Sequence, residues 1–105
     1  MKTNGIFIYI TCSSHQEGKK IAMHLLEKRL IACANMVPIT SLYRWQGRVL
    51  DEQECVLIVK TLESLYDELV KEVSGIHSYT IACITKIPVH FNEMYFKWLH
   101  KEVER

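Results

Sequence analysis

Apolar, strand-like segments alternate with amphipathic, helix-like segments along the chain. Residues 5–12, GIFIYITC, are almost continuously apolar, as is CVLIVK in the second half of residues 49–60, which is typical of strands covered on both faces. A further strand is predicted over 33–45. Pro38 interrupts it and cannot donate a ladder hydrogen bond, so we expect an edge strand or a bulge there. A fourth strand is predicted over residues 80–89.

Helical spacing and end signals predict helices after the first, third and fourth strands. Ser14 and Glu17 have the spacing of a capping box, which indicates the start of the first helix. Thr61 is expected to cap a second helix, and Gly75 is expected to end it. Asn92 is expected to cap a last, short helix. The predicted order is therefore β-α-β-β-α-β-α.

This order is typical of the ferredoxin-like split-βαβ sandwich, an α+β fold in which helices cover one face of an antiparallel sheet. Right-handed crossovers favour the strand order 4-1-3-2. That order places the two most apolar strands in the centre and the proline-bearing strand at an edge. With 105 residues the chain has the length of one domain, which we predict over residues 1–105. This domain includes the extra helix at its C-terminal end.

The second and third strands, residues 33–60, form a hairpin too long for the first and fourth strands to flank. Gln46 and Gly47 mark its turn. An exposed apolar ribbon invites pairing with another chain, so we expect the projecting part to join copies of the protein. The residues expected at this interface are Leu42, Tyr43, Trp45, Val49 and Leu50.

Composition narrows the function classes. A net charge of +1 argues against a protein that grips nucleic acid or anionic lipid, so neither partner is expected. The third strand also lacks the aromatic residues with which RNA-recognition domains stack bases. The sequence has no glycine-rich phosphate loop, HExxH motif or glycine elbow around a serine, so we expect no enzymatic activity.

Four cysteines are spaced irregularly and form no CxxC pair. No signal peptide or membrane-spanning segment is recognisable in the sequence. We therefore expect reduced thiols and a cytoplasmic protein.

The stretch 30–47, LIACANMVPITSLYRWQG, and VLIVKT at 56–61 closely resemble the CutA family of divalent-cation-tolerance proteins. The resemblance continues through His77 and Tyr79 into the last helix and covers essentially the whole chain. It implies a cytosolic homotrimer joined through long hairpins, with a role in tolerance of copper and other divalent ions. The family's trimers are similar to PII-type signalling proteins, and the resemblance implies no established reaction and no identifiable partner protein.

One segment departs from the family pattern. Relatives usually carry prolines and acidic residues after the motif histidine, whereas residues 77–83 read HSYTIAC. A role of those carboxylates in relatives cannot be carried over to this chain, and the turn that the prolines impose is expected to be looser.

The expected strand order brings the end of the first strand beside the start of the fourth. Cys12, His77 and Cys83 are therefore candidate ligands for copper or another divalent transition metal, because thiolate and imidazole suit such ions. His77 also matches the family motif. The alternative is that the cysteines pack as small buried hydrophobes and that the histidine is a hydrogen-bonded structural residue.

Lys60, Tyr79 and Trp45 are candidates for a ligand site in a cleft between subunits. For Lys60 the alternative is a lysine that snorkels at a strand end. The sequence thus favours a CutA-like trimer that supports metal tolerance by binding metal. The alternative is a PII-like regulator that binds a small metabolite between its subunits.

Overall fold

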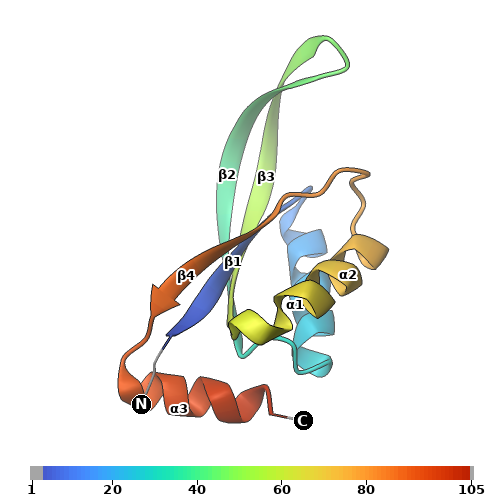
Figure 1. The fold of residues 1–105 in the computed structure, drawn as a ribbon. Coiled ribbons are helices and arrows are strands. Elements are labelled where there is room, and N and C mark those ends of the chain that lie inside the picture. Colours follow the sequence, from blue (N-terminus) through green and yellow to red (C-terminus); the bar gives the residue numbers. More distant parts are fainter. Residues whose placement is uncertain (1–3, 105) are drawn as a thin grey trace.

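The computed structural model describes residues 4–104 as an antiparallel sheet with three helices around it (Figure 1). Its strand order, β2-β3-β1-β4, confirms the predicted α+β ferredoxin-like topology. The predicted domain also includes residues 1–3 and 105, which lie outside the described residues. In chain order the elements are β1 (Asn4–Cys12), α1 (His15–Glu27), β2 (Cys33–Trp45), β3 (Arg48–Thr61), the 3-10 turn η1 (Glu63–Leu65), α2 (Tyr66–Ile76), β4 (Ile84–His90) and α3 (Glu93–Glu102).

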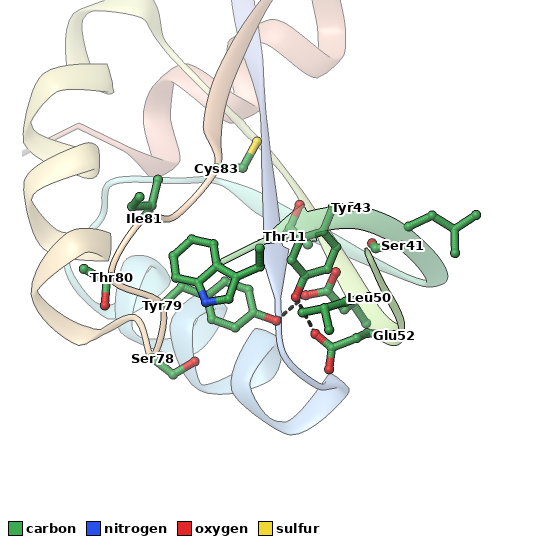
Figure 2. A pocket seen from close by; sticks show the side chains of 13 residues that line it. Thr11, Ser41, Tyr43, Leu50, Glu52, Ser78, Tyr79, Thr80, Ile81 and Cys83 are labelled. Carbon is green, nitrogen blue, oxygen red and sulfur yellow. Dashed lines mark hydrogen bonds between the residues drawn. The ribbon is translucent and has the colours of Figure 1, made fainter. Parts of the chain in front are cut away.

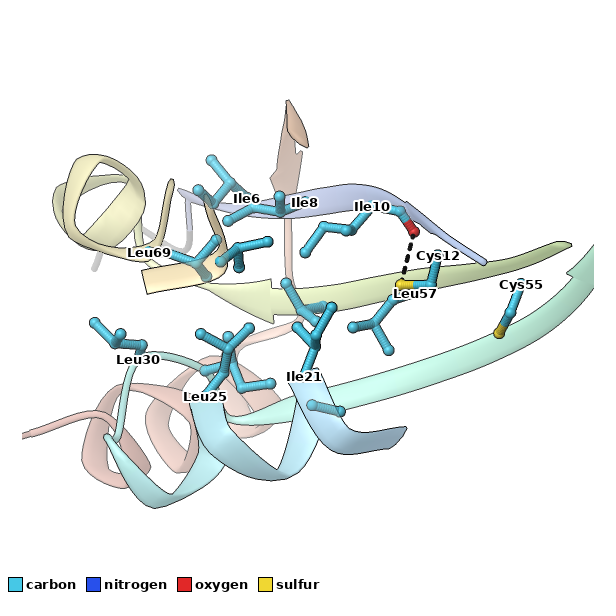
Figure 3. Close-up of a cluster of buried hydrophobic side chains, with 14 residues drawn as sticks. Ile6, Ile8, Ile10, Cys12, Ile21, Leu25, Leu30, Cys55, Leu57 and Leu69 are labelled. Carbon is cyan, nitrogen blue, oxygen red and sulfur yellow. Dashed lines mark hydrogen bonds between the residues drawn. The ribbon is translucent and has the colours of Figure 1, made fainter. Parts of the chain in front are cut away.

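The main core lies between one face of the sheet and the helices α1 and α2 (Figure 3). Alternate residues of the two central strands, such as Ile8 and Leu57, point to this face and are fully buried. Helix α1 adds Ile21 and Leu25. Burial of each such side chain contributes about 1.5–3 kcal/mol to stability, so this face fixes the position of both helices.

Helix α3 covers the end of the sheet that lies farthest from the hairpin tip (Figure 1). Its Leu99 is fully buried in a second, smaller cluster. The ring of Phe91, just before the helix, lies 5.9 Å from that of Phe7 in β1 and 5.5 Å from that of Tyr95. Aromatic contacts therefore fix this end of the sheet.

The ends of α2 differ from the prediction. Thr61 does not cap the helix, because it ends β3 and its buried hydroxyl donates a hydrogen bond to the Leu30 carbonyl at 2.6 Å. The turn η1 intervenes before α2 begins. Gly75 lies within α2 rather than after it, since the chain leaves the helix in an extended conformation at His77. Asn92 precedes α3 as predicted, but its side chain makes no capping hydrogen bond.

Residues 80–83, predicted as the start of the fourth strand, form a loop instead. Pairing between β4 and β1 begins only at Ile84, opposite Ile10. Just beyond this point the Thr11 carbonyl accepts a hydrogen bond from the ring of His77, at 2.8 Å. The chain after α2 thus crosses the end of β1 before it can join the sheet.

Strands β2 and β3 continue well beyond the rest of the sheet, as predicted. β1 ends where Cys12 pairs with Cys55, whereas the β2–β3 ladder runs on to the pair Trp45 and Arg48. We term the projecting hairpin, residues 39–54, the arm. It extends the molecule to 49 Å along one axis, against 23 and 21 Å along the others (Figure 1).

A two-residue turn closes the arm. Gln46 and Gly47 have φ values of 51° and 79°, and positive φ at both central residues is typical of the type I′ turn that suits twisted hairpins. Pro38 lies in β2 at the sheet edge, as predicted. Leu42 and Val49 are 71% and 65% exposed, so the rest of the described chain, residues 4–104, leaves the apolar side chains of the arm largely uncovered.

The sheet face opposite α1 and α2, which we term the open face, is only partly covered. Val56 and Ile58 of β3 lie at its centre. Val37 of β2 and Ile87 of β4 lie on either side of them and are 43% and 44% exposed. This open face and the arm therefore leave apolar side chains of the sheet exposed.

Replacement of Leu25 by Ala is expected to lower the free energy of unfolding by about 2–5 kcal/mol, because its side chain is fully buried against the sheet. Leu26, the next residue of α1, is 39% exposed and provides a matched control, for which we expect a much smaller loss. Chemical denaturation of both variants measures the difference. Equal losses would contradict the assignment of the buried face of α1.

Candidate functional site

Two groups of polar residues lie near the base of the arm. The first, which we term the β1-end cluster, consists of Cys12, Glu17 and His77, each with a potential ligand atom within 4.8 Å of the others. Two of the three predicted metal residues, Cys12 and His77, are thus brought together. Cys83 is not in the cluster, because the loop carries it to an exposed position with its Sγ 3.4 Å from Thr85 Oγ1.

The side chain of His77 is fully buried and uses both ring nitrogens. Nδ1 accepts a hydrogen bond from the Tyr79 N–H at 3.0 Å. This fixes the tautomer, so that Nε2 carries the proton and donates to the Thr11 carbonyl at 2.8 Å. His77 therefore anchors the loop after α2 to the end of β1.

Glu17 connects two loops through its carboxylate. One oxygen accepts hydrogen bonds from the N–H and hydroxyl of Ser13, both at 2.8 Å, and the other accepts from the Ser78 N–H at 2.8 Å. Burial disfavours the charge, but these hydrogen bonds outweigh it and lower the pKa of the carboxyl to about 2. The Ser14 hydroxyl still accepts from the Glu17 N–H, as the capping-box spacing predicts.

Cys12, the last residue of β1, is fully buried. Burial, reinforced by the negative charge of Glu17, raises the pKa of its thiol to about 12. The thiol is therefore protonated at neutral pH, and the thiolate that would bind a metal is strongly disfavoured.

Thiol, carboxylate and imidazole form a donor set that suits zinc or copper. In the β1-end cluster, however, none of the three donors is free. His77 and Glu17 already form hydrogen bonds with the backbone and with Ser13, and the Cys12 thiol is protonated. A metal would have to displace these bonds and that proton. The donor chemistry fits a metal, but the hydrogen bonds fit a structural role, in which the cluster attaches the loop after α2 to the end of β1.

The second group lines a pocket between the arm and the loop that follows α2 (Figure 2). We term it the arm-base pocket. Its volume of about 710 Å³ is large enough for a small organic molecule. It is lined by Thr11, Ser41, Leu42, Tyr43, Trp45, Leu50, Glu52, Glu54, Ser78, Tyr79, Thr80, Ile81 and Cys83.

Two tyrosine–carboxylate pairs lie in the arm-base pocket (Figure 2). The Tyr79 hydroxyl donates to Glu54, and the Tyr43 hydroxyl donates to Glu52. Burial and the bond to Glu54 raise the pKa of Tyr79, and the bond to Glu52 raises the pKa of Tyr43 to about 12. Both phenols therefore remain protonated at neutral pH, and the carboxylates give the pocket a negative charge.

Trp45 and Tyr79, two of the three predicted ligand residues, line this pocket together. Lys60 does not. Its ammonium lies 5.9 Å from the ring centroid of Phe7 and 5.5 Å from that of Tyr95, at the end of the sheet covered by α3. The register of β3, which places Lys60 opposite Phe7 and Cys33, keeps it away from the arm, and its ammonium makes cation–π contacts there.

Sequence reasoning missed the acidic residues of both groups. The sequence predicts only a capping role for Glu17, although its carboxylate also reaches a second loop. The positions of Glu52 and Glu54 could have been predicted, because strand alternation places them on the same face as Val56 and Ile58. What the sequence did not contain is the path of the 77–83 loop, which brings Tyr79 to Glu54.

Glu17→Gln is expected to reduce the free energy of unfolding at pH 7 by about 1–3 kcal/mol, through loss of charge-assisted hydrogen bonds. Because the pKa falls from 4.5 to about 2 on folding, the stabilisation is complete above pH 4.5 and lost as the pH approaches 2. In urea denaturation, the difference in the free energy of unfolding between wild type and variant should therefore decrease as the pH falls over that range. Glu27→Gln, an exposed change in the same helix, is the control; a pH-independent gap would contradict this role.

Comparison with known proteins agrees with this architecture. A family model described as CutA1 divalent ion tolerance protein matches residues 6–102. The divalent-cation tolerance protein CutA of Archaeoglobus fulgidus is 41% identical over 99 residues, which cover 93% of this chain and 97% of that protein. Protein CutA of Mus musculus is 37% identical over 91% of this chain, which spans about half of the mouse protein (55%).

The fold comparison gives the same result. The solved structure of the periplasmic divalent cation tolerance protein CutA from Archaeoglobus fulgidus has a TM-score of 0.92 and covers 94% of this chain and 98% of its own. The two chains are 41% identical, so they share both sequence and fold over almost the whole length of this chain. The chain belongs to the CutA1 divalent ion tolerance family.

Proposed function

We propose that this protein acts in divalent-cation tolerance as a homotrimeric, non-enzymatic binding protein that takes a small metabolite in its arm-base pocket. The observation that carries this proposal is the pocket itself, which combines aromatic side chains and carboxylates from the arm and from the loop after α2. A ligand bound there would couple the position of the loop to that of the arm. The names of the relatives, divalent-cation tolerance protein CutA, supply the physiological setting.

The trimer is supported by the uncovered apolar surface. On the arm, Leu42 and Val49 are mostly exposed, and on the open face Val37 and Ile87 are nearly half exposed. Strand β2 also forms a sheet edge, with unpaired backbone groups that can accept another strand. Surfaces of this kind mark contacts between protein chains, and the family resemblance implies three copies.

Tyr43, Trp45 and Leu50 belong both to the expected interface and to the lining of the arm-base pocket. In a trimer joined through the arms, a neighbouring copy would therefore lie close to the pocket. This arrangement resembles that of PII-type regulators, in which ligands bind between subunits.

Metal capture at the β1-end cluster is a second candidate function. The spacing of Cys12, Glu17 and His77, within 4.8 Å, favours it, with copper or zinc as the suitable ion. Against it stand the hydrogen bonds of His77 and the raised pKa of the Cys12 thiol. We therefore rank the arm-base pocket first.

We also propose a reducing compartment such as the cytoplasm. All four cysteines are free thiols, as expected where disulfides do not form. None of the helices within residues 4–104 is long and apolar enough to cross a bilayer. Among the relatives, one is named as periplasmic and two as chloroplastic, so the named compartment varies across the family.

Thr80→Trp is expected to abolish thermal stabilisation by a metabolite extract. Thr80 is exposed and lines the arm-base pocket, so an indole there should fill the pocket without disturbing the core. A low-molecular-weight cell extract, freed of metals on a chelating resin, should raise the Tm of wild type but not of Thr80→Trp. Ser64→Trp, an exposed change in η1, is the control and should respond like wild type.

A calorimetric titration with copper(II) chloride, run alongside the thermal assay, distinguishes metal capture from ligand binding in the pocket. Metal capture predicts that Cys12→Ser with His77→Ala weakens copper binding by more than about tenfold, whereas His90→Ala, a surface control, does not. The pocket proposal predicts the same affinity in all three proteins. Weakened copper binding in the cluster variant, with no response of wild type to the extract, would contradict it.

A further inference from the structure

Glu54 is a buried carboxylate without a positively charged partner. Only 7% of its surface is exposed, and its hydrogen bond comes from the neutral Tyr79 hydroxyl. The ion pairs formed within residues 4–104 include neither Glu54 nor Glu52. A buried carboxylate that is not paired with a basic group favours a cation beside it.

The surroundings of Glu54 indicate what kind of cation. Three aromatic side chains, those of Tyr43, Trp45 and Tyr79, line the same pocket, and no lysine, arginine or histidine is among its lining residues in the described chain. Aromatic faces attract cations, most strongly where water is excluded. Leu50 and Ile81 add apolar surface that a bare metal ion would leave unfilled.

On the basis of the proposed ligand-binding role of the arm-base pocket, we propose that its ligand is a small organic cation of the alkylammonium class. The positive charge would lie near Glu54 and Glu52, and the alkyl groups would contact the aromatic rings and Leu50. A divalent metal ion fits less well, because it prefers several oxygen ligands and each carboxylate already accepts a tyrosine hydroxyl.

The same positive charge has a second possible source, a lysine or arginine of a neighbouring copy. We favour a free ligand because the pocket of about 710 Å³ is much larger than one inserted side chain requires. The two sources differ in what they stabilise: a free cation stabilises the pocket in proportion to its concentration, whereas a side chain stabilises the assembly.

Tetramethylammonium chloride is a suitable probe, compared with sodium chloride at equal ionic strength. The chain has two tryptophans, so Trp98→Phe leaves Trp45, in the pocket, as the sole tryptophan, which can be excited selectively over the tyrosines. In this background the probe should change the fluorescence saturably and raise the Tm. tert-Butanol, a neutral analogue of similar shape, and pivalate, an anionic one, should do neither.

Glu54→Gln keeps an acceptor for the Tyr79 hydroxyl but removes the charge, and it should weaken binding of the probe by about tenfold. Glu63→Gln, an exposed change at the Lys86 ion pair outside the pocket, is the charge-matched control and should leave the affinity unchanged. Equal affinities in these two variants would overturn the proposal.

The remaining outcomes separate this inference from the proposed function. Binding of tert-butanol or pivalate as tightly as the probe would overturn the cationic class and leave a ligand pocket in place. Stabilisation by the metal-free extract without any response to the probe would do the same. If no probe binds and Glu54→Gln lowers the oligomer mass in sedimentation, the cation is a neighbour's side chain and the inference is wrong.

Discussion

The β2–β3 ladder is much longer than β1, and this difference in length determines where the arm and the arm-base pocket form. β1 stops at the pair Cys12 and Cys55, but β2 and β3 remain hydrogen-bonded to each other as far as their turn. Beyond that point the hairpin has no strand beside it and no helix over it within residues 4–104. The backbone of the arm is therefore hydrogen-bonded while apolar side chains such as Leu42 and Val49 stay exposed, and this combination favours assembly.

The end of β1 also determines where the arm-base pocket forms. His77 and Glu17 bind the segment after α2 to this strand end, and that segment then reaches the arm through Tyr79 and Glu54. Residues 77–83 contain no proline, and the sequence therefore predicts a loose turn. Hydrogen bonds of His77 and Glu17 attach this segment to the end of β1 and the start of α1.

Much of the fold could be predicted because it follows from one-dimensional patterns. Continuous apolar runs identified the central strands, Pro38 identified the edge, and the length of residues 33–60 identified the arm. Local signals were less reliable where tertiary contacts competed with them. Thr61 resembled a helix cap but satisfies its hydroxyl on Leu30, in a segment distant in the sequence.

The candidate site was harder to predict, because loops rather than strands complete it. Strand order alone predicts that Cys12 and His77 lie together, but it misplaces Cys83, because residues 80–83 form a loop and not a strand. The acidic residues of the arm-base pocket carry no motif. Their meaning depends on burial and on which charges lie nearby, and only the folded chain contains that information.

Sedimentation velocity over a dilution series to low micromolar concentration tests the central claim, that several copies must cover the arm and the open face. We predict one species of about three times the 12.3 kDa chain mass, which persists on dilution together with native near-ultraviolet circular dichroism. A folded, cooperatively unfolding species at 12.3 kDa would contradict it.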